Sequence, residues 1–185
     1  MKFHDVGLEG ARLVELSPFA DSRGRFSRLF CSTLFAEAGL EGNFVQINES
    51  FNISPRTLRG MHFQLPPAAE VKVVRCMQGR MWDCIVDLRP SSATYRKWFG
   101  AELTPENNLM MYVPKGFAHG FITIEPNTFA IYLASSAYTP GSERGVRYND
   151  PGFAIEWPLL PAVISDKDKG WADFDEEMVR SLAQL

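Results

Sequence analysis

The sequence predicts an all-β fold, a sandwich or barrel with a few short helices. Three observations lead to this class: short apolar runs alternate with turn residues, several runs alternate apolar and polar residues with a period of two, and helical periodicity is sparse. The apolar runs are ARLVELSPF, NFVQINESF, VKVVRCMQG, RMWDCIVDLRP, RKWFGAEL, LMMYVPKG, AHGFITI and FAIYLASSAY. The length of 185 residues suits one domain over residues 1–185.

The run RMWDCIVDL shows the strand periodicity most clearly. Because side chains alternate between the two faces of a strand, each face should carry every second residue. One face would hold Met81, Asp83, Ile85 and Asp87, and the other Trp82, Cys84, Val86 and Leu88. Gly79 and Arg80 separate this run from the preceding VKVVRCMQ, and such a two-residue connection predicts a β-hairpin.

Two segments predict helices. In CSTLFAEAGL, Ser32 or Thr33 provides an N-cap and Gly39 provides a stop. The last segment of the sequence, WADFDEEMVRSLAQL, predicts an amphipathic C-terminal helix. Its acidic start suits the positive end of the helix dipole.

Charge and cysteine content exclude several functions. A net charge of −3 leaves no basic surface for nucleic acid and no polybasic segment for a membrane. No apolar run approaches the length of a membrane span, and the N-terminus has no apolar signal core. The cysteines Cys31, Cys76 and Cys84 lack CxxC spacing, which is typical of reduced thiols, so we expect a cytoplasmic protein.

Two polar clusters interrupt the apolar runs. In RGMHFQ, His62 and Gln64 would face the same side of a strand, and Gly60 would let a ligand or another backbone come close. In VPKGFAHGF, a turn at Gly116 precedes His119, which could then point into the mouth of a barrel.

Together the two clusters resemble the two halves of the cupin pattern, which implies a jelly-roll barrel. The first half of that pattern usually holds two histidines and a glutamate, but here Gln64 replaces the second histidine and Glu70 lies near the place of the glutamate. An amide is a poor metal ligand compared with imidazole or carboxylate. Spacing alone leaves two interpretations open: a three-ligand metal site of His62, Glu70 and His119, or core histidines whose hydrogen bonds are satisfied by the backbone.

Further motifs extend the resemblance over nearly the whole chain. The sequence resembles the dTDP-4-dehydrorhamnose 3,5-epimerase family through DSRGRF, QINES, LRGMHFQ, VKVVRCMQGRMWDCIVDLR, LTPENNLMMYVPKGFAHGF, the strand around Tyr132, SERGVRYNDP, IEWP and SDKD. The resemblance implies a cupin jelly roll without metal or cofactor that forms a homodimer. Its substrate would be a nucleoside-diphosphate 4-keto-6-deoxyhexose, inverted at C3, C5 or both during deoxysugar biosynthesis for surface polysaccharide.

The same resemblance implies roles for individual residues. His62 would be the catalytic base, and Asp168 would orient it. Tyr132 would be the acid on the opposite face of the sugar, and Lys72 would lie near the ketone oxygen. The positions implied to bind substrate are Arg23, Phe26, Arg28, Gln46, Asn48, Arg59, His119, Tyr138, Glu143 and Lys167. Of these, Tyr138 would stack on the base, and the N-terminal segment would reach the nucleotide of a neighbouring subunit.

The implied chemistry suits these residue types. A C–H bond beside a ketone is a weak acid, and positive charge from Lys72 and Arg59 would stabilise the enolate oxygen that forms. Imidazole is the side chain best suited to accept a proton at neutral pH. A carboxylate such as Asp168 would fix its tautomer and favour the imidazolium. Because epimerisation also requires a proton on the other face, an acid must stand opposite, and Tyr132 could supply it.

Two positions depart from the usual pattern of the family. Arg28 stands where a glutamate is common, and Ile47 stands where an aspartate is common. A glutamate can accept the N3–H of thymine, whereas an arginine only donates, and its fork matches acceptors of cytosine or guanine. We therefore expect a CDP- or GDP-linked keto-sugar to be accepted at least as well as the dTDP-linked one, unless Arg28 turns to a phosphate.

Two other classes of function stay open at the level of sequence. A metal-dependent cupin oxygenase or isomerase would use His62, Glu70 and His119, and Gln64 argues against it. A non-catalytic sugar-nucleotide binder would keep the fold without the chemistry. The joint presence of His62, Tyr132 and Asp168 argues against that second class.

Overall fold

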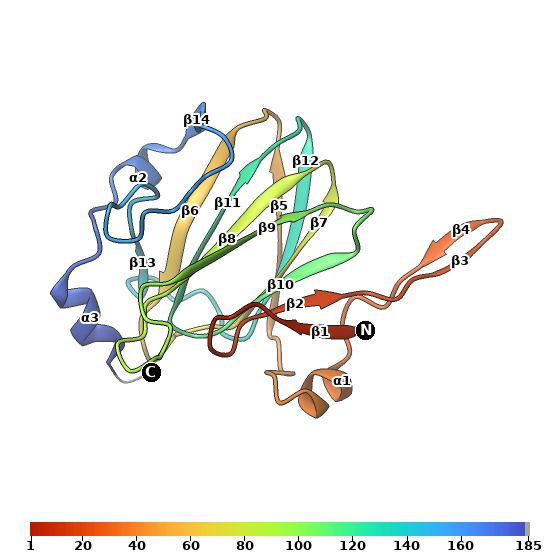
Figure 1. Ribbon diagram of the computed structural model, residues 1–185, viewed down its shortest axis with the longest axis horizontal. Helices are drawn as coiled ribbons and strands as arrows, with labels where there is room; N and C mark the ends of the chain where they lie inside the picture. Colours follow the sequence, from red (N-terminus) through yellow and green to blue (C-terminus); the bar gives the residue numbers. More distant parts are fainter. Residues whose placement is uncertain (184–185) are drawn as a thin grey trace.

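Two six-stranded sheets face each other in the computed structural model, which describes residues 1–183 (Figure 1). The first sheet has the order β1 (Lys2–Asp5), β2 (Arg12–Glu15), β10 (Leu109–Val113), β7 (Lys72–Gln78), β12 (Thr128–Ala134) and β5 (Gln46–Asn52). The second has the order β13 (Glu143–Gly145), β6 (Thr57–Gln64), β11 (Phe117–Thr123), β8 (Met81–Asp87) and β9 (Trp98–Leu103), with β14 (Val163–Ile164) parallel beside β6. This confirms the predicted all-β jelly-roll class.

The main hydrophobic core lies between the two sheets. Both sheets contribute to it, with Val74 and Met111 from the first and Met81 and Ile85 from the second. A second cluster, which includes Cys84 and Val86, covers the outer face of the second sheet, and a third cluster covers part of the outer face of the first. The alternation predicted for RMWDCIVDL is therefore confirmed, and both of its faces are buried.

The connection at Gly79 and Arg80 joins the two sheets, so the predicted hairpin is wrong. β7 pairs with β10 and β12, whereas β8 pairs with β9 and β11. Gly79 has φ +73°, and a Cβ there would lie 2.6 Å from the hydroxyl oxygen of Thr128. Such a tight glycine turn has the same sequence pattern whether the next strand pairs with the previous one or crosses to another sheet.

Both predicted helices are present but shorter than predicted. The first is α1 (Ser32–Glu37), whose N-cap is Cys31 instead of Ser32 or Thr33, and Gly39 ends it with φ +71°. The C-terminal one is α3 (Glu176–Leu182), capped by Asp175. Residues 184–185 of the predicted helix lie outside the described residues. None of the helices in residues 1–183 is long and apolar enough to cross a membrane.

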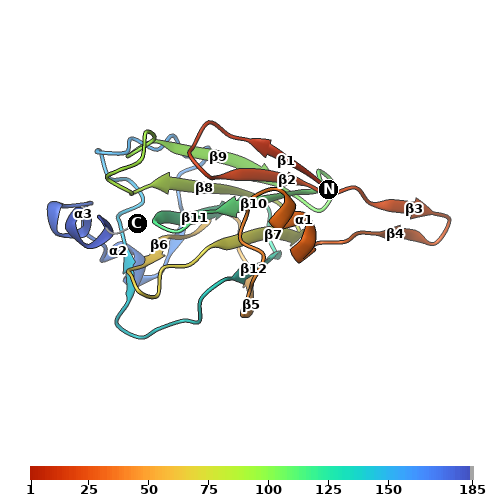
Figure 2. The same ribbon diagram turned by 90° about the horizontal axis from the view of Figure 1, so that it is seen from below.

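Two features were not predicted as elements. The first is α2 (Asp166–Lys169), a single turn that follows β14. The second is an arm made of β3 (Phe19–Asp21) and β4 (Gly24–Phe26), which projects away from both sheets (Figures 1 and 2). Its phenylalanines Phe19 and Phe26 are 76% and 67% exposed.

The three cysteines are unpaired thiols, as predicted. Cys76 and Cys84 are buried within the strands, and Cys31 is half-buried. Burial raises the pKa of Cys76 to about 11, which keeps it protonated and unreactive at neutral pH.

Candidate active site

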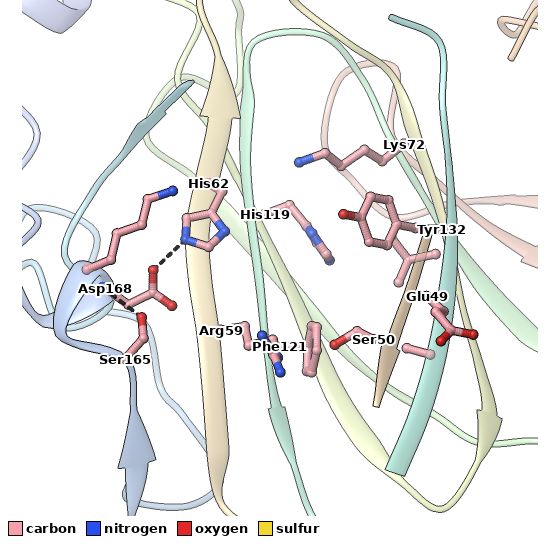
Figure 3. A pocket seen from close by; sticks show the side chains of 13 residues that line it. Glu49, Ser50, Arg59, His62, Lys72, His119, Phe121, Tyr132, Ser165 and Asp168 are labelled. Carbon is pink, nitrogen blue, oxygen red and sulfur yellow. Dashed lines mark hydrogen bonds and ion pairs between the residues drawn. The ribbon is translucent and has the colours of Figure 1, made fainter. Parts of the chain in front are cut away.

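A cavity of about 320 Å³ opens between the two sheets (Figure 3). Its walls come from β6 and β11 on one side, from β5, β7 and β12 on the other, and from α2 at the rim. The lining residues are Glu49, Ser50, Arg59, His62, Lys72, Val74, His119, Phe121, Ala130, Tyr132, Ser165, Lys167 and Asp168. All four residues implied as catalytic therefore line one cavity, although they come from four different elements.

His62 and Asp168 form a hydrogen-bonded pair on one wall. The His62 Nε2 lies 2.6 Å from the Asp168 Oδ1, and the other carboxylate oxygen accepts the Gly60 backbone N–H at 3.3 Å. The Ser165 hydroxyl caps α2 by accepting the Asp168 backbone N–H. Burial pushes the pKa of Asp168 upward. The hydrogen bond and charge of His62, together with the hydrogen bonds of Gly60 and Ser165, outweigh burial and lower that pKa. Asp168 is therefore an ionised partner for the imidazole.

A second histidine–aspartate pair stands beside the first. His119 on β11 lies opposite His62 in the strand register, and its Nε2 is 2.8 Å from the Asp83 Oδ1. Asp83 is fully buried, and its Oδ2 has no hydrogen-bond partner among the described residues. Burial raises the pKa of Asp83, and the charge and hydrogen bond of His119 only partly oppose it.

The two strands fit together closely where the histidines meet. Gly60 has φ +136°, and a Cβ there would lie 2.5 Å from the Cα of Gly120. The register of β6 against β11 shifts between His119 and Phe121. Gly60 thus lets another backbone come close, as predicted, and that backbone is the strand of His119.

Tyr132 and Lys72 face His62 from the opposite sheet (Figure 3). Burial and the nearby Glu70 carboxylate raise the pKa of Tyr132, so its hydroxyl keeps its proton at neutral pH. The Lys72 Nζ lies 3.1 Å from the Glu70 Oε1, and both side chains are largely buried. A proton donor and a cation therefore stand across the cavity from the imidazole.

Arg59 is fixed at the edge of the cavity by Asn52. Its Nε donates to the Asn52 Oδ1 at 2.7 Å, and the Asn52 amide donates to the Thr128 backbone oxygen at 3.2 Å. Arg59 also lines the cavity, and the terminal nitrogens of its guanidinium suit a bidentate contact with an anion.

A smaller cavity of about 100 Å³ adjoins the first and shares His62, Lys72 and Tyr132 with it. It is also lined by the predicted binding residues Gln46, Asn48, Tyr138 and Glu143. The Lys167 Nζ lies 2.6 Å from the Glu143 Oε2, to which the Tyr138 hydroxyl donates at 3.4 Å. These hydrogen bonds and ion pairs lower the pKa of Glu143 although burial opposes them.

Gln64 holds the segment that carries Tyr138. Its Oε1 accepts the backbone N–H of Thr139 at 2.9 Å, and its Nε2 donates to the backbone oxygens of Ala68 and Ala137. The amide thus uses both its acceptor and its donors. Gln64, which stands where the cupin pattern has a metal-binding histidine, therefore has a structural role in holding this segment.

The predicted residues Arg23, Phe26 and Arg28 are not brought to the cavity of their own chain. They lie on the projecting arm or just after it (Figure 1), and Arg23 is paired with Asp21 at 2.6 Å. Ile47 is exposed on the outer side of β5, because Gln46 and Asn48 on either side of it face the cavity. The departure at Ile47 consequently leaves the cavity lining unchanged.

The three candidate metal ligands have separate partners. His62 is bonded to Asp168, His119 to Asp83, and Glu70 to Lys72. Within residues 1–183, no three His, Cys, Asp or Glu side chains are grouped so that they could hold a metal ion. His62 and His119 are thus bonded to aspartate carboxylates, and not to the backbone groups that the core-histidine interpretation expected.

Sequence reasoning missed several residues of the site. Asp83 was assigned to a strand face but was not paired with His119, and Asn52 and Trp171, which contact Arg59 and His62 of the cavity, were not singled out. A carboxylate between the apolar Met81 and Ile85 was the available signal for Asp83, because a charge on a buried strand face needs a partner. The partners of Asn52 come from strands far away in the chain, which no local pattern reveals.

A carboxylate-bound imidazole on one wall and a tyrosine hydroxyl on the other are groups suited to proton transfer at two faces of a substrate, the chemistry of an isomerase, here on a jelly roll. The chain belongs to the dTDP-4-dehydrorhamnose 3,5-epimerase family, whose model matches residues 5–176. A relative of that name from Sinorhizobium fredii is 40% identical over 169 residues, which are 91% of this chain and 87% of the relative.

Solved structures of the family agree with this assignment. The dTDP-4-dehydrorhamnose 3,5-epimerase of Elizabethkingia anophelis has a TM-score of 0.90 at 39% identity and covers 94% of this chain and 96% of its own. The enzyme of Bacillus anthracis, solved with TDP and PPi bound, has a TM-score of 0.90 at 38% identity and covers 94% of this chain and 99% of its own. The predicted family and the predicted nucleotide-sugar epimerase activity are therefore confirmed.

Proposed function

We propose that the chain epimerises a dTDP-linked 4-keto-6-deoxyhexose, with His62 as base and Tyr132 as acid. The observation that carries this assignment is the position of the His62–Asp168 pair on one sheet and of Tyr132 on the other, across one cavity. His62 removes the proton from a carbon beside the ketone, and the electron pair of the broken C–H bond forms the enolate. Tyr132 then delivers a proton to the opposite face of that carbon, and both side chains return to their starting states through solvent.

Charge around the cavity supports the enolate step. Lys72 and Arg59 bring positive charge to the walls that would surround a sugar ketone, and such preorganised charge is a large source of rate acceleration. Glu70 holds the Lys72 ammonium in place at 3.1 Å. The ionised Asp168 stabilises the imidazolium that forms when His62 accepts the proton.

The direct test is deuterium incorporation from solvent. The protein would be incubated in D₂O with dTDP-4-keto-6-deoxyglucose, and deuterium at C3 and C5 would be measured separately by NMR. Incorporation with inversion at C3, C5 or both is the expected result, and it also decides which carbons react. Absence of exchange at both carbons would contradict the assignment.

A thymidine nucleotide is favoured over the cytidine or guanosine nucleotide suggested by Arg28. The Bacillus anthracis relative, which is similar to this chain over 94% of its length, was solved with TDP bound. Calorimetric titration with dTDP, UDP, CDP and GDP separates these substrates. Tighter binding of dTDP is expected, whereas tighter binding of CDP or GDP would restore the interpretation based on Arg28.

We also infer a homodimer in which the arm of one subunit binds over the cavity of its partner, in the cytoplasm. The edge strand β5 and its flanks expose the apolar residues Val45, Ile47, Phe51 and Ile53. An exposed apolar edge strand tends to associate with another apolar surface. A second copy of the chain, whose arm exposes phenylalanines, can bury it. The arm would carry Arg23, Phe26 and Arg28 to the nucleotide of the partner.

Subunit complementation tests the arm exchange. One variant carries His62→Ala with an intact arm, and the other has an intact cavity but a Gly-Ser linker in place of residues 19–26. Each homodimer should be nearly inactive, while co-refolded heterodimers regain activity because one cavity receives an intact arm from its partner. Mixtures that stay inactive despite heterodimer formation would show that each arm serves its own subunit.

A further inference from the structure

Trp171 lies against the catalytic pair without lining either cavity. Its ring centroid is 6.3 Å from that of His62, with an angle of 69° between the ring planes, which is an edge-on contact. The Lys167 Nζ lies over the indole, 5.8 Å from the ring centroid. Trp171 therefore contacts the side chains of His62 and Lys167 but does not line the cavities that a substrate would occupy.

The indole is seated on a bare stretch of backbone. Gly145 of β13 lies directly opposite His62 in the strand register, and a Cβ at Gly145 would lie 2.3 Å from the Trp171 Cε2. The φ angle of Gly145 is outside the left-handed region, so the glycine is required for space and not for conformation. The place of Trp171 therefore depends on the absence of a side chain at Gly145.

The element that carries Asp168 needs such support. α2 has only four residues, so its own hydrogen bonds give it little stability. Ser165 and the short strand β14 hold its N-terminal side. After Gly170 the chain reaches Trp171, whose indole fixes the other end of α2 against β13 and His62.

We propose that Trp171 is a positioning residue for the His62–Asp168 pair, an inference that rests on the proposed role of His62 as base. The indole fixes the orientation of the imidazole and shields its bond to Asp168 from water on the side away from the cavity. The Trp171 Nε1 is buried and has no hydrogen-bond partner among residues 1–183. Trp171 thus acts through the packing of its ring and not through a hydrogen bond. Trp171→Phe, which keeps an aromatic ring, should retain much of this packing.

A double-mutant cycle tests this role. Trp171→Ala should lower kcat by up to about 10²-fold, the loss typical of a small misplacement of catalytic groups, while KM changes little. Trp171→Phe should stay close to wild type. Gly145→Ala should lower kcat like Trp171→Ala, but should cost nothing more in the Trp171→Ala background because the clash partner is gone. An equal loss in both backgrounds would show that Gly145 does not act through Trp171.

A second readout does not depend on turnover. The His62 ring N–H bonded to Asp168 should give a slowly exchanging proton signal in NMR, assigned by its loss in His62→Ala, since the chain has only three histidines. The signal should persist in Trp171→Phe and be lost in Trp171→Ala at a temperature where circular dichroism shows a folded protein. If Trp171→Ala does not fold, Trp171→Leu replaces it in both experiments.

The possible failures are distinguishable. Wild-type kcat and a retained N–H signal in the Trp171→Ala or Trp171→Leu protein would overturn the positioning role and leave His62 as base. Undiminished deuterium exchange in His62→Ala would overturn the proposed function itself, whatever the Trp171 variants do.

Discussion

The two histidine–aspartate pairs use the same residue types in different surroundings. Asp168 accepts hydrogen bonds from several donors, which lower its pKa, whereas Asp83 is fully buried with one oxygen unpartnered, and burial raises its pKa. A carboxylate that stays ionised can stabilise an imidazolium, and this favours His62 over His119 as the proton acceptor. The surroundings of each aspartate therefore distinguish two histidines that lie side by side in one cavity.

His62→Ala should lower the rate of deuterium exchange at the carbon beside the ketone by about 10²–10⁴-fold, the usual contribution of a general base. The fold should survive, because the His62 side chain is partly exposed to the cavity. His4→Ala is the matched control, since His4 is exposed on β1, where its ring bonds to the Glu15 carboxylate away from the cavity. Exchange at the wild-type rate in His62→Ala would assign the base to another residue.

Tyr132→Phe should separate exchange from inversion. Removal of the proton by His62 should continue, so deuterium still enters, but delivery to the opposite face should slow because the hydroxyl is gone. NMR of the product measures the two rates in one sample. If inverted product still formed at the original rate, water or another side chain would have to be the acid.

The sequence reveals those site residues whose partners lie close to them in the chain, and it does not reveal those whose partners are distant. His62 and Gln64 share a strand face, so an alternating pattern was enough to place them together. Asp168 lies 106 residues from His62, and only the family resemblance linked the two. Trp171 is positioned by Gly145, and a missing side chain leaves no local signal.

At the scale of elements, Gln64 connects β6 with the segment that follows β12. Gln64→Ala removes three hydrogen bonds to that segment and to Ala68, each with a net value of about 1 kcal/mol. Looser placement of Tyr138 should raise KM by roughly tenfold, with kcat nearly unchanged. Steady-state kinetics measures both constants, and Gln78→Ala, which loses one exposed bond to Asn127, serves as the control. A fall in kcat with constant KM would contradict this assignment.

The strands were predictable because their alternation is strong, and the connections were not. Every apolar run noted in the sequence contains a strand, yet the turn at Gly79 and Arg80 crosses between sheets instead of closing a hairpin. α2 escaped prediction because its four residues, DKDK, have no apolar periodicity. The start of α3 shifted to Glu176 because Asp175, and not a residue nearer Trp171, caps its first turn.

At the scale of the whole molecule, the buried Asp87 should govern acid stability. Its carboxylate accepts hydrogen bonds from Arg89, Ser92 and Thr94, which lower its pKa although burial opposes them. A carboxyl whose pKa is lower in the folded chain leaves the unfolded chain binding more protons as the pH falls. Its stabilisation is therefore complete above about pH 4 and is lost as the pH falls through the folded pKa.

Asp87→Asn should lower the free energy of unfolding by about 3 kcal/mol at pH 7, because it leaves Arg89 without its charged partner. The difference from wild type should shrink as the pH falls toward 3, where the wild-type carboxyl also loses its charge. Urea denaturation at each pH measures both proteins. Asp166→Asn, at a fully exposed carboxyl, is the control and should change little at any pH. A difference that grows toward low pH would contradict the argument.

The strand order has a consequence for how the molecule reaches its native state. In the two large sheets of the described chain, only β1–β2 and β8–β9 are neighbours both in space and in sequence. Each of the other strand pairs closes a long loop, and the entropy cost of closing it must be met before the strand contacts can stabilise it. Refolding should therefore take milliseconds to seconds. His62 can meet Asp168 only after nearly the whole chain has been synthesised and ordered. Recovery of catalysis after dilution from denaturant should therefore follow the last phase of refolding, and chains truncated before α2 should have almost no activity.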